Sequence, residues 1–332
     1  MKFGAVPLAQ AQGAILAHSM QGREGRIAKG TVLTRAHLDA LSAAGWSQIT
    51  VARLEPGDVE ENAAAARLAR SVVPDPGASG LRISTAGAGR VNLYATGPGV
   101  VAVRAAAVEA LNSVDPAITL ATVPPFQRTA AGRMVATIKI ISYAVSMDDL
   151  DRAGAAGAGA LQVLGPRYGS ASLIETQVST RLPSAKGREA LAVRLERLGL
   201  SLSPRQVVPH DEAAIADALT AAPGEVLFVL GASATSDSRD VAPEGLRRAG
   251  GKVSAFGMPV DPGNLLFFGW LGAKPVIGLP GCARSPAMNG ADWVLERLIC
   301  GVDLSAQDIR AMGAGGLLKE IPTRPLPRRS KG

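Results

Sequence analysis

Three segments rich in glycine and hydroxyl-bearing residues, all in the second half of the chain, hold the residues best suited to chemistry. The first, residues 231–243 with the sequence GASATSDSRDVAP, follows the unbroken apolar run Val226–Leu230. A helix is expected to begin at Pro243, because proline suits a first helical turn. Hydroxyl groups and the free N–H groups of a helix start together suit a phosphate. The candidate ligand-binding residues of this segment are Gly231, Ser233, Thr235, Ser236, Ser238 and Arg239.

Asp240, near the end of the same segment, has two interpretations. Its carboxylate is placed to position a magnesium ion or to accept a hydrogen bond from a ligand N–H. Alternatively, Asp240 only caps the helix that follows, and Arg239 pairs with it.

The second segment is residues 257–264, with the sequence GMPVDPGN. Its two glycines permit positive φ angles and its two prolines stiffen the chain. The candidate ligand-binding residues here are Asp261, Gly263 and Asn264. The alternative is a plain tight turn in which Asp261 is hydrogen-bonded to its own backbone.

The third segment is residues 279–290, with the sequence LPGCARSPAMNG, and its small residues allow a backbone to approach a ligand closely. Its candidate ligand-binding residues are Gly281, Cys282, Arg284 and Ser285. Cys282 is either a thiol whose pKa Arg284 lowers or simply a small buried residue. Elsewhere, no spacing indicates a Ser/His/Asp triad, a His/Cys metal cluster, a Walker loop or a G-x-G-x-x-G motif.

The elements around these segments alternate between strands and helices. Strands are predicted at 161–164, 206–208, 226–230 and 252–256, helices at 186–198, 212–221, 243–248 and 293–300, and a hairpin at 265–279. This alternation predicts an α/β domain with a doubly wound, mostly parallel sheet. Ligands of such sheets bind beyond the carboxyl ends of the strands, where the three segments lie.

The first half of the chain predicts an α+β domain. Helices are expected at 7–18, 35–44, 59–71 (capped by Asp58) and 104–112, a strand at 48–52, and β-prone runs between 81 and 145. The Ala/Gly-rich stretch 153–160 favours a hinge, with a tightly packed segment as the alternative. The predicted domains are therefore residues 1–152, residues 153–305 and a basic, proline-containing tail at 306–332.

Composition narrows the function classes. The 332 residues are 47% hydrophobic and 19% charged, and the net charge is +7, of which residues 319–332 supply more than half. Nucleic-acid binding through this tail is disfavoured, because 4% aromatic residues leave few stacking platforms. No apolar run reaches the roughly 18 residues of a membrane span, and two cysteines fit a reducing compartment. We expect a cytoplasmic protein without a membrane partner.

Several segments resemble the molybdopterin-binding and molybdenum cofactor biosynthesis family. SRDVAPEG at 238–245 is similar to the signature of molybdopterin adenylyltransferases. Residues 257–281 are similar to the Pro-Gly loop, hairpin and Gly-Leu-Pro-Gly strand end of gephyrin-like molybdenum-insertion enzymes. Residues 207–219 resemble an earlier strand and helix of the family, and residues 6–19 and 27–34 its opening segments. GMPVDPGN and PGCARSP also resemble a variant group often joined to a nucleotidyltransferase domain.

The resemblance implies roles for individual residues. Asp240 matches the family's acidic residue at the pterin-nucleotide site, and either Asp211 or His210 matches the other acidic position. The resemblance therefore implies that Asp240 and Asp211 are catalytic residues. It also implies a magnesium ion at Asp240. Gly263 and Gly281 match glycines that line the pterin and its phosphate. Three departures weaken catalysis more than binding: ASATS at 232–236 replaces a glycine-rich run, Asp261 replaces a lysine, and Cys282 replaces an asparagine.

We therefore expect a protein that binds molybdopterin or its nucleotide derivative and delivers it to a cofactor nucleotidyltransferase or an apo-molybdoenzyme. The alternative is an active molybdopterin adenylyltransferase or molybdate-inserting transferase that uses magnesium and ATP. A further alternative is a nucleic-acid-binding or regulatory module acting through the tail. The resemblance also implies a homo-oligomer.

Overall fold

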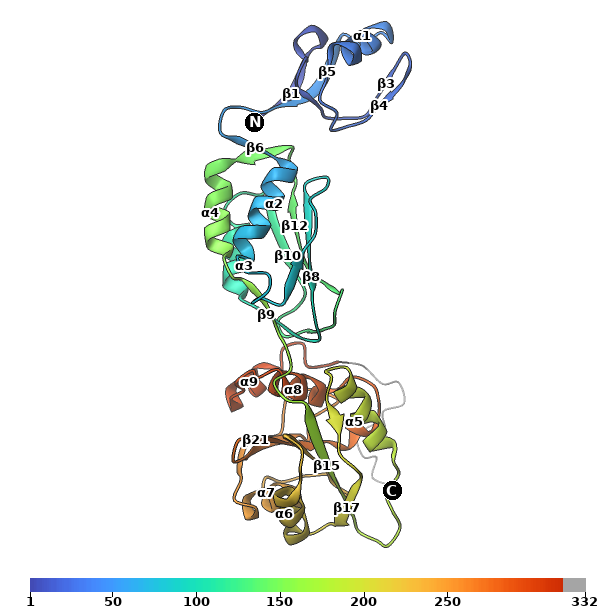
Figure 1. Cartoon of the computed structure of the whole chain (residues 1–332), viewed down its shortest axis with the longest axis vertical. Coiled ribbons are helices and arrows are strands. Elements are labelled where there is room, and N and C mark those ends of the chain that lie inside the picture. The colour runs from blue at the N-terminus through green and yellow to red at the C-terminus, as the bar shows by residue number, and fades with distance from the viewer. Residues whose placement is uncertain (319–332) are drawn as a thin grey trace, which may run out of the picture. The chain divides into compact units, whose positions relative to one another are not determined.

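The structure, a computed structural model, describes residues 1–318, so most of the predicted basic tail lies outside the described residues. Contacts divide the chain into two compact units (Figure 1). The first comprises residues 1–97 and 101–163, and the second comprises residues 98–100 and the chain from 164 onward. No helix within residues 1–318 is long and apolar enough to cross a membrane.

The first unit opens with a small antiparallel sheet. Its strands are β1 (Lys2–Pro7), β5 (Gln48–Arg53) and β2 (Ile15–Leu16), with β5 in the middle, and the hairpin β3 (Met20–Gly22) and β4 (Gly25–Ile27) lies beside it. Helix α1 (Arg35–Ala43) packs Leu38 and Leu41 against the sheet. The helix predicted at 7–18 is wrong: residues 8–10 form one 3₁₀ turn, Gly13 has a positive φ, and β2 pairs with β5.

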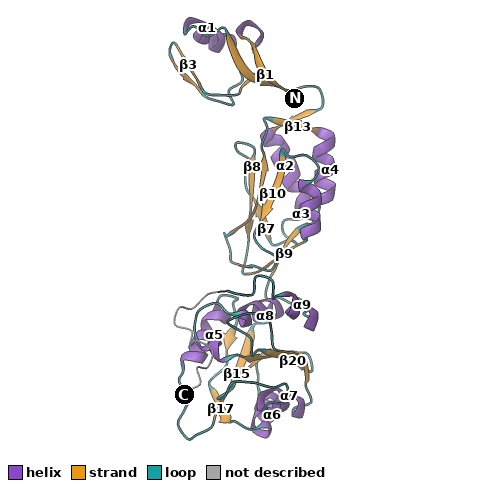
Figure 2. Ribbon diagram, turned by 180° about the vertical axis from the view of Figure 1, so that it is seen from behind, coloured by secondary structure: helices purple, strands orange, loops and turns teal. Residues whose placement is uncertain are grey.

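The rest of this unit is a helix-covered antiparallel sheet. The strand order is β10 (Ile118–Thr122), β12 (Met134–Ile140), β8 (Arg90–Ala95) and β7 (Leu81–Ile83). Helices α2 (Glu61–Val72), α3 (Ala105–Asn112) and α4 (Met147–Gly157) cover one face of it (Figure 2). Two smaller sheets join β11 (Arg128–Thr129), β9 (Gly99–Val103) and β14 (Leu161–Leu164), and β6 (Asp58–Glu60) with β13 (Ala144–Ser146).

Two expectations for this region are corrected. Glu60, not Asp58, caps α2, because Asp58 lies in β6 and its carboxylate binds the amino terminus of Met1 at 2.8 Å. The hinge at 153–160 is also wrong, since most of the stretch belongs to α4. A Cβ on Gly157 would lie 2.4 Å from Leu111, so small residues are needed where α4 packs against α3.

The second unit is an α/β fold, as predicted. Its sheet runs in the order β16 (Ser201–Leu202), β15 (Ser170–Gln177), β18 (Val226–Leu230), β21 (Lys274–Leu279), β20 (Phe267–Leu271) and β19 (Lys252–Phe256), and β17 (Gln206–Pro209) also pairs with β15. β15 pairs in parallel with β16, β17 and β18, and β18 pairs in parallel with β21. β20 is antiparallel to both of its neighbours, β21 and β19. All five residues of β18 are buried, as expected of a central strand.

Helices pack against this sheet. α6 (Glu212–Ala221) and α7 (Val241–Arg248) lie together on one face, where Ile215 and Leu246 join a core with Leu227 and Phe267. α5 (Lys186–Glu196) contacts β16 and the short helix η2 (Gly281–Arg284), and α8 (Gly290–Ile299) contacts β21. α9 (Ala306–Ala311), capped by Ser305, forms within the segment predicted as tail.

Candidate functional site

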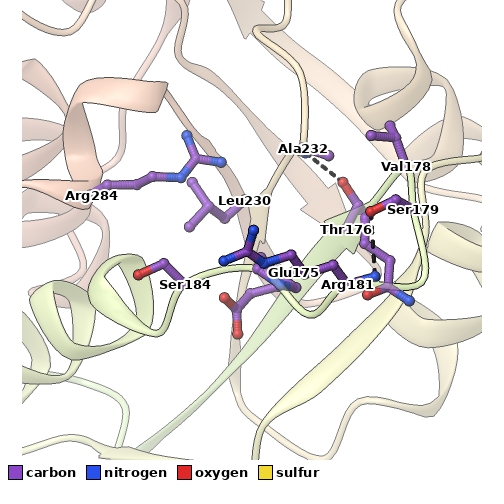
Figure 3. A pocket seen from close by; sticks show the side chains of 11 residues that line it. Glu175, Thr176, Val178, Ser179, Arg181, Ser184, Leu230, Ala232 and Arg284 are labelled. Carbon is purple, nitrogen blue, oxygen red and sulfur yellow. Dashed lines mark hydrogen bonds between the residues drawn. The ribbon is translucent and has the colours of Figure 1, made fainter.

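A cavity of about 180 Å³ lies at the carboxyl ends of β15 and β18 (Figure 3). Neighbouring parallel strands end here, and the loop after β15 and the helix η2 close the sides. This is the edge at which α/β sheets bind their ligands. The residues that line the cavity are Glu175, Thr176, Gln177, Val178, Ser179, Arg181, Pro183, Ser184, Leu230, Ala232 and Arg284.

Thr176 joins the ends of three strands at this cavity. Its Oγ1 accepts a hydrogen bond from the backbone N–H of Ala232, after β18, at 2.7 Å. The same oxygen lies 2.8 Å from Nδ1 of His210, directly after β17. Because Thr176 is only 1% exposed, these bonds fix the loops after β17 and β18 relative to β15.

Glu175 is a buried carboxylate that is already neutralised. Arg205 donates to both of its oxygens, at 2.7 and 3.1 Å, and this pairing raises the pKa of Arg205. Arg205 also donates to the carbonyl oxygen of Pro183 at 2.6 Å, which ties down the loop after β15. The acid therefore positions the loop and leaves little negative charge in the cavity.

Two further arginines give the cavity its positive charge. Arg284 donates to the carbonyl oxygen of Gly231 at 2.6 Å, and in Figure 3 its side chain extends from η2 toward the loop after β18. The guanidinium of Arg181 makes no hydrogen bond or ion pair within residues 1–318. Ser179 and Ser184 add hydroxyl groups. Arginine donors beside hydroxyls, with the one acid paired, suit a phosphate or another oxyanion.

Arg194 holds η2 from behind. Its side chain is 4% exposed, and its Nε lies 2.6 Å from Asp292 at the start of α8. It also donates to the carbonyl oxygens of Ala283, Ser285 and Ala287, at 2.9, 2.8 and 3.0 Å. One buried guanidinium thus connects α5, η2 and α8 and fixes the backbone that carries Arg284.

Asp211 and Asp240, the two implied catalytic residues, are helix N-caps outside the cavity lining. Asp211 accepts from the N–H of Ala214 at 2.9 Å. Asp240 accepts from Val241 at 2.7 Å and from Ser236 at 2.9 Å, one bond on each oxygen. Asp240 therefore caps α7, as the second of its two interpretations predicted. The pairing of Arg239 with Asp240 does not occur within residues 1–318. Magnesium binding at Asp240 stays a prediction.

The segment after β18 reaches the cavity only at its start. Gly231 supplies the carbonyl that Arg284 binds, and the next residue, Ala232, lines the cavity. The four hydroxyl-bearing residues and Arg239 lie beyond that point in the chain and do not line it; they are Ser233, Thr235, Ser236 and Ser238. Their part in binding a ligand stays a prediction.

The segment 257–264 packs on α8 rather than into the cavity. A Cβ on Gly263 would lie 2.7 Å from the N–H nitrogen of Gly290, so this backbone approach requires glycine. Asn264 closes the loop on itself through Met258, with bonds of 3.0 and 3.2 Å. The backbone of Asp261 bonds to Gly316 and Leu318, beyond α9.

In the segment 279–290, Arg284 alone lines the cavity. Gly281 is exposed at the start of η2, and Ser285 offers its carbonyl to Arg194. Both interpretations of Cys282 are wrong. The residue is exposed rather than buried. Desolvation of its thiol raises the pKa, the carboxylates of Asp261 and Asp292 add to the rise, and the charge that opposes it belongs to Arg194, not Arg284. Cys282 is therefore a protonated thiol at neutral pH.

Sequence reasoning missed the strand β15 and the loop after it, which supply eight of the eleven lining residues. The signal was weak because β15 reads SASLIETQ, without an apolar run or strict alternation. Its buried polar residues are satisfied by partners far along the chain, such as Arg205 for Glu175 and Ser203 for Ser172.

Two segments of the chain match models of protein families. Residues 180–299 match the model of a probable molybdopterin binding domain, and residues 5–53 match a domain of unknown function. No curated protein matches the chain.

Among solved structures, the chain is similar to a molybdopterin biosynthesis MoeA protein from Pyrococcus horikoshii at 14% identity and a TM-score of 0.30, covering 93% of this chain and 75% of that one. It is also similar to a molybdenum cofactor biosynthesis protein B at 16% identity and a TM-score of 0.28, covering 40% of this chain and 88% of that one. Residues 180–299 of the second unit are therefore similar to a probable molybdopterin binding domain, and this match includes Arg181, Leu230, Ala232 and Arg284 of the cavity lining but begins after Ser179.

Proposed function

We propose that the chain binds molybdopterin, or its nucleotide derivative, through the cavity at the ends of β15 and β18. The observation that carries this proposal is the pair Arg181 and Arg284 beside serine hydroxyls, within a domain of the molybdopterin binding family. Molybdopterin carries a phosphate, and arginines bind phosphate oxygens through planar, charge-assisted hydrogen bonds. The residues present therefore fit the phosphate end of this cofactor.

The chain's proposed role is to hold and deliver the cofactor in molybdenum cofactor biosynthesis. Adenylyl transfer or molybdate insertion would need a magnesium ion near Asp240, whose two oxygens each already accept a backbone N–H. Within residues 1–318, no three or more His, Cys, Asp or Glu side chains gather into a metal site. The proposed recipient is a cofactor nucleotidyltransferase or an apo-molybdoenzyme, and the proposed assembly is a homo-oligomer.

The experiment is an incubation of the purified chain with molybdopterin and magnesium ATP, followed by mass identification of bound and released pterins. A carrier retains unmodified molybdopterin, and the Arg181→Gln variant retains less of it. Adenylylated pterin would instead make the chain a transferase. A chain that retains no pterin would contradict binding altogether.

A further inference from the structure

We propose that a second cavity, in the first unit, binds a small molecule carrying a phosphate or carboxylate group. The cavity measures about 330 Å³ and is formed by β11, the turn that follows it and the start of β12, with Val101 of β9 and Val123 beside them. It lies wholly within the first unit, so it is a different site from the cavity at the ends of β15 and β18.

The charge of this cavity is positive. Among residues 1–318, the charged residues that line it are Arg128 and Arg133, and none of the lining residues described there is acidic. The backbone of Arg133 is fixed, because its N–H donates to Ala130 and its carbonyl accepts from Ala95. Its guanidinium makes no hydrogen bond or ion pair within residues 1–318, so the charge is available to a ligand.

Thr129 supplies the second, independent observation. It is 5% exposed, and its Oγ1 has no hydrogen-bond partner in the described chain. A buried hydroxyl without a partner costs free energy, and such groups are rare in folded proteins. Thr129 lines the cavity and lies between the two arginines in sequence, so its hydroxyl is a hydrogen-bonding group beside the space that a ligand would occupy.

The size and remaining lining of the cavity define the ligand further. At about 330 Å³ it lies at the lower end of small-molecule pockets and is larger than a bare oxyanion needs. Val101, Val123 and Met134 add apolar surface, and Met134 is 52% exposed at the rim. The ligand class is therefore an organic anion with a short apolar body, and Gln127 offers an amide to its polar atoms.

The test is a titration of the full chain with phenyl phosphate and, separately, with benzoate, followed by NMR of the backbone amides. We expect saturable shifts of residues 127–135 with at least one probe, and the probe that binds more tightly identifies the anionic group. Arg133→Gln and Thr129→Val weaken this binding by about tenfold or more. Thr129→Ser, which keeps the hydroxyl, retains it, and so does Arg70→Gln, which makes the same charge change on the exposed surface of α2.

Shifts at residues 176–184 are followed separately, because phosphate binding there tests the proposed function and not this inference. Thermal unfolding of each variant checks that the first unit stays folded. Failure of both probes to shift residues 127–135 at millimolar concentration would overturn the inference, as would wild-type affinity in a folded Arg133→Gln variant.

Discussion

Arg194 is the side chain on which the geometry of the candidate site depends most. Arg194 is buried and pairs with Asp292. It also donates hydrogen bonds to one carbonyl oxygen of its own helix and to three carbonyl oxygens of the segment that begins with η2. Arg284, by contrast, is exposed and extends toward the cavity. Arg194 thus fixes the backbone from which Arg284 extends toward the cavity.

Replacing Arg194 by Met should destabilise the second unit by about 3–5 kcal/mol, because it leaves the buried carboxylate of Asp292 unpaired. The measurement is the free energy of unfolding in urea. Replacing both partners, as Arg194→Met with Asp292→Leu, should cost less than the sum of the single changes. The matched control is Arg197→Met, at an exposed position at the end of the same helix. Equal stability of Arg194→Met and Arg197→Met would show that the pair does not hold η2.

Both cysteines should react more slowly with alkylating reagents than an ordinary exposed thiol does. Desolvation raises the pKa of Cys282, and burial raises the pKa of Cys300 to about 12. Since only the thiolate reacts, alkylation of Cys282 at neutral pH should be slower than that of a free thiol and should increase with pH. Cys300 should react only after unfolding. The measurement is the pH dependence of iodoacetamide labelling by mass, and fast labelling of Cys282 at pH 7 would contradict this assignment.

At the scale of secondary structure elements, apolar pattern and capping residues predicted most of the second unit. β18 was predicted from five consecutive apolar residues and α6 from Asp211, which does cap it. β15 was not predicted, because its polar side chains are buried only through partners such as Arg205, and such distant pairings leave no local pattern. The sequence therefore predicted candidate residues at the same edge of the sheet as this cavity, but it did not predict most of the residues that line the cavity.

The start of α5 packs closely against side chains of the cavity lining. A Cβ on Gly187 would lie 2.4 Å from Cδ2 of Leu230 and 3.2 Å from Cγ of Arg284. Gly187→Ala should therefore push Leu230 and Arg284 out of place and lower the affinity for molybdopterin by about tenfold. Titration by pterin fluorescence measures this. Gly169→Ala, whose added Cβ makes only an ordinary 3.7 Å contact with Glu225, is the control, and equal affinities of the two variants would refute the packing argument.

At the scale of the whole molecule, the distribution of basic residues along the chain distinguishes the proposed cofactor binding from nucleic-acid binding. Residues 319–332 contain five basic residues and one acidic residue, a net of +4 within a total of +7. A chain ending at residue 318 is therefore only mildly basic, while both proposed cavities lie within it. Removing residues 319–332 should leave the affinity for molybdopterin unchanged within about twofold. A loss of pterin binding on truncation, or retained and strongly salt-dependent binding of nucleic acid, would contradict this division.

The most direct test of the account is the affinity for molybdopterin of three arginine variants that carry the same charge change. We predict that Arg181→Gln and Arg284→Gln, which remove donors from the cavity lining, each weaken binding by about tenfold or more. Arg239→Gln, in the segment that the sequence favoured but outside the lining, should bind as the wild-type chain does. Loss of binding in Arg239→Gln, with Arg181→Gln and Arg284→Gln unaffected, would contradict the cavity at β15 and β18 as the cofactor site.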